Sequence, residues 1–162
     1  MITPMNKAEL LQRIIIQLTH DLNVFFTAAK TAHEAATNTE NIPDNKYCTL
    51  ALEASYVAQG QANRAQELRH SIEIFKQLPL VSDDETIRLT SLVTIQAGDG
   101  SGKTVFIGPL EGGLRVTAGD TEIMVITPAS PLGRELIGKG PGDTVEIAAG
   151  SSRMTYEIVE VG

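Results

Sequence analysis

The amino-acid sequence predicts an α+β fold, with a long helical hairpin in the first half and a small sheet domain with one short helix in the second. The first observation is where helix-breaking residues lie. Residues 5–78 contain one proline and one glycine, whereas all the other glycines lie after residue 97. The second is apolar periodicity, which is helical early in the chain and typical of short strands later. We therefore predict a hairpin over residues 1–80 and a sheet domain over residues 81–162.

Two apolar seams predict that the hairpin is an antiparallel coiled coil. Their residues recur with alternating spacings of three and four, which is the coiled-coil period. The first seam is Leu11, Ile15, Leu18, Leu22, Phe25, Ala29, Ala32 and Ala36, and the second is Ala51, Ala54, Ala58, Gln61, Ala65, Leu68, Ile72 and Phe75. A short polar turn, with its tip near residues 38–46, joins the two helices, so they pack antiparallel. A helical bundle or a dimer interface is the alternative, but the alanines near the tip argue against a bulky core there.

The second half contains five runs that predict strands. They cover residues 91–96, 104–107, 122–127, 144–148 and 154–161. Between the third and fourth runs, Ser130 is a good N-cap, Pro131 a good first helical residue and Gly138 a good helix terminator. We expect this short helix to cover one face of the sheet.

Composition excludes several classes of function. The formal net charge is −7, with six basic and twelve acidic residues after residue 80, which argues against a surface that neutralises nucleic-acid phosphates. The single cysteine, Cys48, excludes a disulfide framework and favours a reducing, cytoplasmic location. No apolar run is long enough to span a membrane. The three histidines lack the spacing of a helical metal site.

The predicted tip of the hairpin carries the candidate chemistry. Asn41 and Pro43 are typical of the start of a helix, with Asp44 in its first turn. Asp44 then balances the helix dipole. Alternatively, Glu40 and Asp44 provide carboxylate oxygens, which are the ligands that Mg²⁺ prefers. The spacing alone favours the first interpretation.

Three segments resemble the C-terminal domain of the bacterial Gre transcript-cleavage factors. They are Ser130–Lys139 (SPLGRELIGK), Gly142–Val145 (GDTV) and Tyr156–Val159 (YEIV). A long N-terminal hairpin is the other half of that family, and the family's tip carries an acidic residue followed by Asn, as Asp44 and Asn45 do here. The resemblance therefore covers essentially the whole chain.

The resemblance implies an FKBP-like sheet domain that docks on RNA polymerase, and a hairpin that enters the polymerase's secondary channel. It implies that Ser130, Pro131 and Leu132 form the docking segment. It also implies that the tip (Asp44, Glu40 and Asn41) acts on RNA cleavage, with Asp44 helping to hold a Mg²⁺ ion shared with the polymerase. The chain would then be an accessory factor and not an enzyme, a monomer without a cofactor of its own, in contact with nucleic acid only through the transcription complex.

At the tip the sequence departs from the family's pattern. Asn41 stands where the family has an acid, and Thr37 and Leu52 are neutral where the cleavage factors have basic residues. A regulator that occupies the channel without stimulating cleavage is therefore an alternative. A coiled-coil adaptor for another protein is a second one. A prolyl isomerase is a third, although the sheet domain has few aromatic residues to line such a pocket.

Overall fold

The computed structural model describes residues 6–39 and 45–162 and has the predicted α+β class. Its backbone packs into two compact units. We call residues 15–76 the helical unit. The sheet unit combines residues 77–162 with residues 6–14. The independent domains that the sequence predicts on either side of residue 80 stay a prediction.

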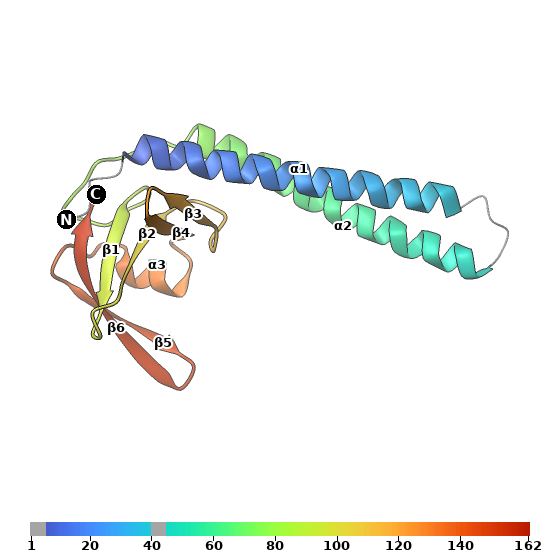
Figure 1. The fold of residues 1–162 in the computed structure, drawn as a ribbon. Coiled ribbons are helices and arrows are strands. Elements are labelled where there is room, and N and C mark those ends of the chain that lie inside the picture. Colours follow the sequence, from blue (N-terminus) through green and yellow to red (C-terminus); the bar gives the residue numbers. More distant parts are fainter. Residues whose placement is uncertain (1–5, 40–44) are drawn as a thin grey trace. The chain divides into compact units, whose positions relative to one another are not determined.

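Two helices, α1 (Lys7–Thr39) and α2 (Asn45–Lys76), run antiparallel side by side and make up the helical unit from Ile15 onward (Figure 1). The second predicted seam is confirmed from Ala58 to Phe75, because Leu68 and Phe75 are fully buried and the helix positions around them are largely exposed. In α1, Leu18 is buried and the seam residues from Leu22 to Ala32 are half-buried. For Ala36, Ala51 and Ala54, whose side chains are not described, the seam stays a prediction.

At the base of α1 the predicted seam is displaced by one residue. Leu10 and Ile14 are fully buried, whereas the predicted Leu11 and Ile15 are half-buried. Residues 7–14 belong to the sheet unit and not to the helical unit. A spacing pattern that assumes only two paired helices takes no account of the sheet unit.

In the described part of the chain, six strands form one mixed sheet in the order β3-β4-β2-β1-β6-β5. The strands are β1 (Leu92–Ala97), β2 (Gly102–Ile107), β3 (Arg115–Ala118), β4 (Thr121–Ile126), β5 (Thr144–Ala149) and β6 (Ser152–Val161). Only β2 and β4 pair in parallel, and the other pairs are antiparallel. The strand β3 was not predicted; it is only four residues long and follows shortly after a glycine pair.

Both faces of the sheet bury apolar side chains. One face holds the main core, which includes Val105, Ile107 and Ile158. On the opposite face, Phe106 pairs with Val125 across β2 and β4, and both are fully buried. This accounts for the unbroken apolar run in β2, because a strand covered on both sides does not alternate.

The short helix α3 (Pro131–Leu136) connects β4, near one edge of the sheet, to β5 at the other edge. Its buried residues Leu132 and Leu136 belong to the main core, so α3 covers that face as predicted. Gly138 follows the helix with a φ of 85°, a left-handed conformation that glycine adopts without strain.

Burial in the helical seam predicts a difference between two chemically identical substitutions. Ile72→Ala removes a side chain that is 6% exposed, and Ile16→Ala removes one that is 67% exposed. We expect the first to lower the free energy of unfolding by about 2–4 kcal/mol and the second to change it by less than about 0.5 kcal/mol. Helix-monitored denaturation of both variants provides the measurement. Equal losses would contradict the assignment of Ile72 to the seam.

Candidate functional site

The three residues predicted at the hairpin tip, Glu40, Asn41 and Asp44, lie outside the described residues. Within residues 6–39 and 45–162 the structure contains no group of three or more His, Cys, Asp or Glu side chains that could hold a metal ion. The roles assigned to the tip stay predictions.

The predicted docking segment begins with a hydroxyl group that both donates and accepts a hydrogen bond within the segment. Ser130 Oγ accepts a hydrogen bond from the Gly133 backbone N–H (3.0 Å) and donates one to the Thr127 carbonyl (2.7 Å). The first is the N-cap that the sequence predicts. The second ties the start of α3 to the end of β4. The Ser130 side chain therefore fixes the local backbone through its hydrogen bonds to Thr127 and Gly133.

Close backbone approaches then fix α3 in place. A Cβ atom on Gly133 would lie 1.9 Å from the Thr127 carbonyl oxygen, and one on Gly140 would lie 2.3 Å from the Glu85 carbonyl oxygen. Only glycine fits at such distances. Around the turn after α3, Gly138 N–H donates to the Ile87 carbonyl (2.9 Å), and Ile87 N–H donates to the Lys139 carbonyl (2.8 Å).

Exposure separates the predicted docking residues. Pro131 is exposed, whereas Leu132 is 9% exposed and packs in the main core. Two residues that the sequence analysis did not single out, Arg134 and Ile137, are exposed, Ile137 to 38%. The accessible part of this segment thus differs from the one the motif indicates, because the motif also contains residues that serve the fold.

The segment that supports α3 is organised by Asp83. Its Oδ1 accepts hydrogen bonds from the backbone N–H groups of Glu85 (2.9 Å) and Thr86 (3.0 Å), and its Oδ2 pairs with Arg88 (2.6 Å). The Thr86 and Glu85 bonds, followed by Arg88, hold the pKa of Asp83 below its ordinary value of 3.8.

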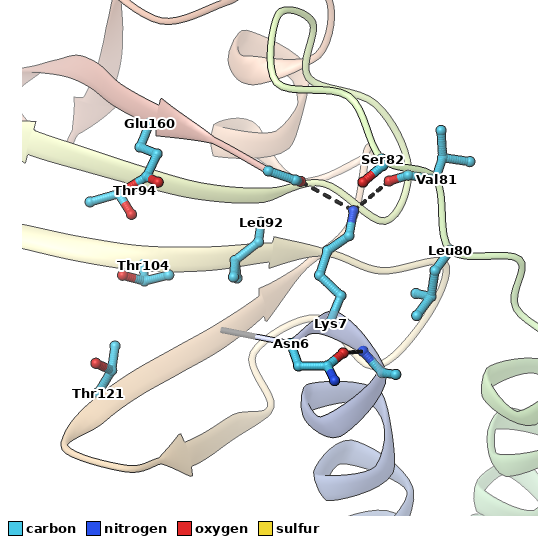
Figure 2. Close-up of a pocket in the computed structure, with 12 residues that line it drawn as sticks. Asn6, Lys7, Leu80, Val81, Ser82, Leu92, Thr94, Thr104, Thr121 and Glu160 are labelled. Atoms are coloured by element: carbon cyan, nitrogen blue, oxygen red, sulfur yellow. Dashed lines mark hydrogen bonds between the residues drawn. The ribbon is translucent and has the colours of Figure 1, made fainter. Parts of the chain in front are cut away.

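Lys7, in the first turn of α1, joins three separate segments of the sheet unit. Its ammonium group donates to the backbone carbonyls of Val81, Thr90 (2.8 Å) and Gly162 (3.2 Å). Figure 2 shows the hydrogen bond from Lys7 to Val81. Partial burial of the ammonium lowers the pKa of Lys7, and the nearby Asp83 carboxylate opposes that shift. An ammonium group has three N–H donors, so these three carbonyls satisfy all of them.

Beside Lys7 lies a cavity of about 420 Å³. Figure 2 shows its polar wall, where threonine side chains from three strands and the carboxylate of Glu160 stand on one side of the sheet. Those threonines are Thr94, Thr104 and Thr121. The cavity offers hydroxyl and carboxylate groups to a hydrogen-bonding ligand. No sequence signal predicted it, because its residues come from several distant segments.

None of the helices in residues 6–39 and 45–162 is long and apolar enough to cross a membrane.

Comparison with known proteins gives matches to one family. The family model described as "Transcription elongation factor, GreA/GreB, C-term" matches residues 82–162. The transcription elongation factor GreA of Brucella anthropi is 31% identical over 121 residues, which cover 74% of this chain and 71% of that protein. GreA of Brucella canis is 28% identical over the same shares of the two chains.

Two solved structures are also similar. Gfh1 of Thermus aquaticus has 21% sequence identity and a TM-score of 0.40, over 90% of this chain and 91% of that one. The GreA/GreB elongation factor from Nitrosomonas europaea has 16% identity and a TM-score of 0.37, over 67% and 90%.

The family model and the Brucella relatives place the chain among the transcription elongation factors. It belongs to the GreA/GreB family. The resemblance seen in the sequence is thereby confirmed.

The Lys7 contacts predict a large effect for a substitution that keeps an unbranched apolar side chain but removes the ammonium group. Lys7→Met removes a charged donor from three carbonyls, which should lower the free energy of unfolding by about 1.5–3 kcal/mol. Lys30→Met changes an exposed lysine of the same helix and should have an effect below about 0.5 kcal/mol. Urea denaturation of both variants tests this, and similar stability of the two would refute the structural role of Lys7.

The lowered pKa of Asp83 predicts a pH-dependent contribution to stability. The charged carboxylate stabilises the fold above pH 3.8, and this contribution is lost as the pH falls through the lower folded-state pKa. We expect Asp83→Asn to be less stable than the unchanged chain at neutral pH, and the difference to shrink below pH 3.8. Denaturation curves across this range provide the measurement, with Asp84→Asn, an exposed neighbour, as the control. A difference that does not depend on pH would argue against the charge of Asp83 as its source.

Proposed function

We propose that this chain regulates transcription elongation by docking on RNA polymerase with its sheet unit and inserting its helical hairpin into the secondary channel. Membership of the GreA/GreB family is the observation that carries this proposal. The family model covers the sheet unit from residue 82 onward, and the Brucella relatives are named as transcription elongation factors. An adaptor for an unrelated protein or a prolyl isomerase has no comparable support.

The length of the helices is compatible with a probe into a channel. The helices α1 and α2 contain 33 and 32 residues, and a helix rises by about 1.5 Å per residue. Each is therefore about 50 Å long, and the seam between them holds them together as one hairpin.

At the tip, the carboxylates of Asp44 and Glu40 are hard oxygen donors, so their chemistry suits Mg²⁺. A Mg²⁺ ion bound there and shared with the polymerase would stabilise the attacking and leaving oxygens of RNA hydrolysis. In this proposal Asp44 is the principal ligand from this chain, and the polymerase supplies the active site. The chain itself lends a carboxylate and keeps the hairpin in position.

Asn41 favours a second candidate function. It places a neutral amide where the resemblance leads us to expect a second acid. An amide oxygen is a weaker ligand for Mg²⁺ than a carboxylate because it carries no net charge. The second candidate is therefore a factor that occupies the channel and leaves cleavage unstimulated.

RNA cleavage in backtracked polymerase complexes distinguishes the two candidates. If the chain stimulates cleavage, Asp44→Ala should reduce the rate by about tenfold or more, as expected on loss of a metal-site group. Glu67→Ala, an exposed acid of α2, should leave the rate unchanged. Equal rates for the unchanged chain and Asp44→Ala would remove Asp44 from the mechanism.

A gain of function provides the complementary test. Asn41→Asp restores a carboxylate and should raise cleavage if the neutral amide limits it. A chain that binds the polymerase but stimulates cleavage neither before nor after this substitution would be the non-cleaving regulator.

A further inference from the structure

The basic side chains of the sheet unit differ in whether they have a partner within the unit. Six of its eight lysines and arginines have partners within the unit. Lys7 binds carbonyls, Lys103 lies 4.8 Å from the ring centre of Tyr156, and four arginines form ion pairs: Arg13 with Glu9, Arg88 with Asp83, Arg115 with Glu122 and Arg153 with Glu146. Over the described residues, the structure gives no ion pair or ring contact to Arg134 or Lys139.

These two cations lie within one short segment, in α3 and the turn that follows it. They are exposed on a unit whose residues after Lys76 include twelve acids. One of these acids, the exposed Glu135, is adjacent to Arg134 in sequence, yet no ion pair joins it to either cation. Their charges are thus available to another molecule.

Apolar surface accompanies the charges. Ile137 is 38% exposed between Arg134 and Lys139 in sequence, and Pro131 is exposed at the start of α3. The backbone beneath them is held by the Ser130 cap and by the Ile87 hydrogen bonds. We call Pro131, Arg134, Ile137 and Lys139 the α3 patch. Because its backbone is fixed, little conformational entropy is lost when a partner binds it.

We propose that the α3 patch, rather than Ser130 and Leu132, contacts RNA polymerase, and that the polymerase surface it meets is acidic with an apolar centre. This inference rests on the proposed function. Carboxylates of the partner would complete the ion pairs of Arg134 and Lys139, while Ile137 packs against apolar atoms. The rest of the sheet unit is predominantly acidic and repels such a partner, so the patch also sets the orientation of docking.

Two charge-reversed double variants of the full chain test the proposal. Arg134→Glu with Lys139→Glu reverses the cations of the patch. Arg115→Glu with Arg153→Glu makes the same change in net charge at two cations that are 70% and 77% exposed and already paired. Binding of each labelled chain to core RNA polymerase is measured at low and high salt, about 0.05 M and 0.3 M. Thermal unfolding verifies that each variant is folded.

The patch variant should bind at least about tenfold more weakly at low salt and lose most of the salt dependence of binding. The Arg115 and Arg153 variant should bind nearly as the unchanged chain does. If the unchanged chain binds and both variants match it, or both weaken equally, the role of the patch is refuted while the proposed function stands. If the unchanged chain does not bind the polymerase at all, the proposed function fails and the inference with it.

Ile137→Ala examines the apolar component separately. It should weaken binding severalfold at both salt concentrations without altering the salt dependence, because no charge changes. Unchanged affinity would remove Ile137 from the contact.

Discussion

The ammonium group of Lys7 connects parts of the chain that are far apart in sequence. Its three carbonyl partners lie 74, 83 and 155 residues away. One of them, Thr90, is fully buried and has a φ of 75°, an unfavourable conformation for a β-branched residue. Its N–H donates to the Ile107 carbonyl, and its hydroxyl accepts from Val81 N–H. The first turn of α1 is therefore part of the sheet unit, where it binds segments that follow it by 74 residues or more.

Around α3, too, individual side chains hold together parts of the fold. Ser130 and Leu132 belong to the segment that carries the family resemblance, but the first caps the helix and the second fills the core. In the docking that we propose, both residues hold the backbone beneath the side chains that contact the partner. A motif can thus mark an interaction surface while its most recognisable residues maintain the fold. Arg134 and Lys139, which belong to the same segment, are the side chains that remain exposed.

Local signals in the sequence predicted the local structure well. The alternating three- and four-residue spacing located both long helices, and the sequence from Ser130 to Gly138 located α3 with its cap. Features of the structure that depend on residues distant in sequence were predicted less well. The four-residue β3 exists because it pairs with β4, and Leu10 and Ile14 are buried in a part of α1 that belongs to the sheet unit. The accessible part of the docking segment could not be predicted, since the burial of Leu132 depends on strands elsewhere in the chain. The tip residues are known from sequence alone.

The contacts of Lys7 also have a consequence for how the chain is made. The ribosome synthesises α1 first, when the segments around Thr90 and Gly162 do not yet exist. Contacts between residues so distant in sequence form slowly, because closing a long loop costs entropy before the contact is gained. The two long helices can pair on the nascent chain as soon as α2 has emerged. The sheet unit has to wait for β6, and the complete set of Lys7 contacts forms only after Gly162, which follows β6, has been synthesised.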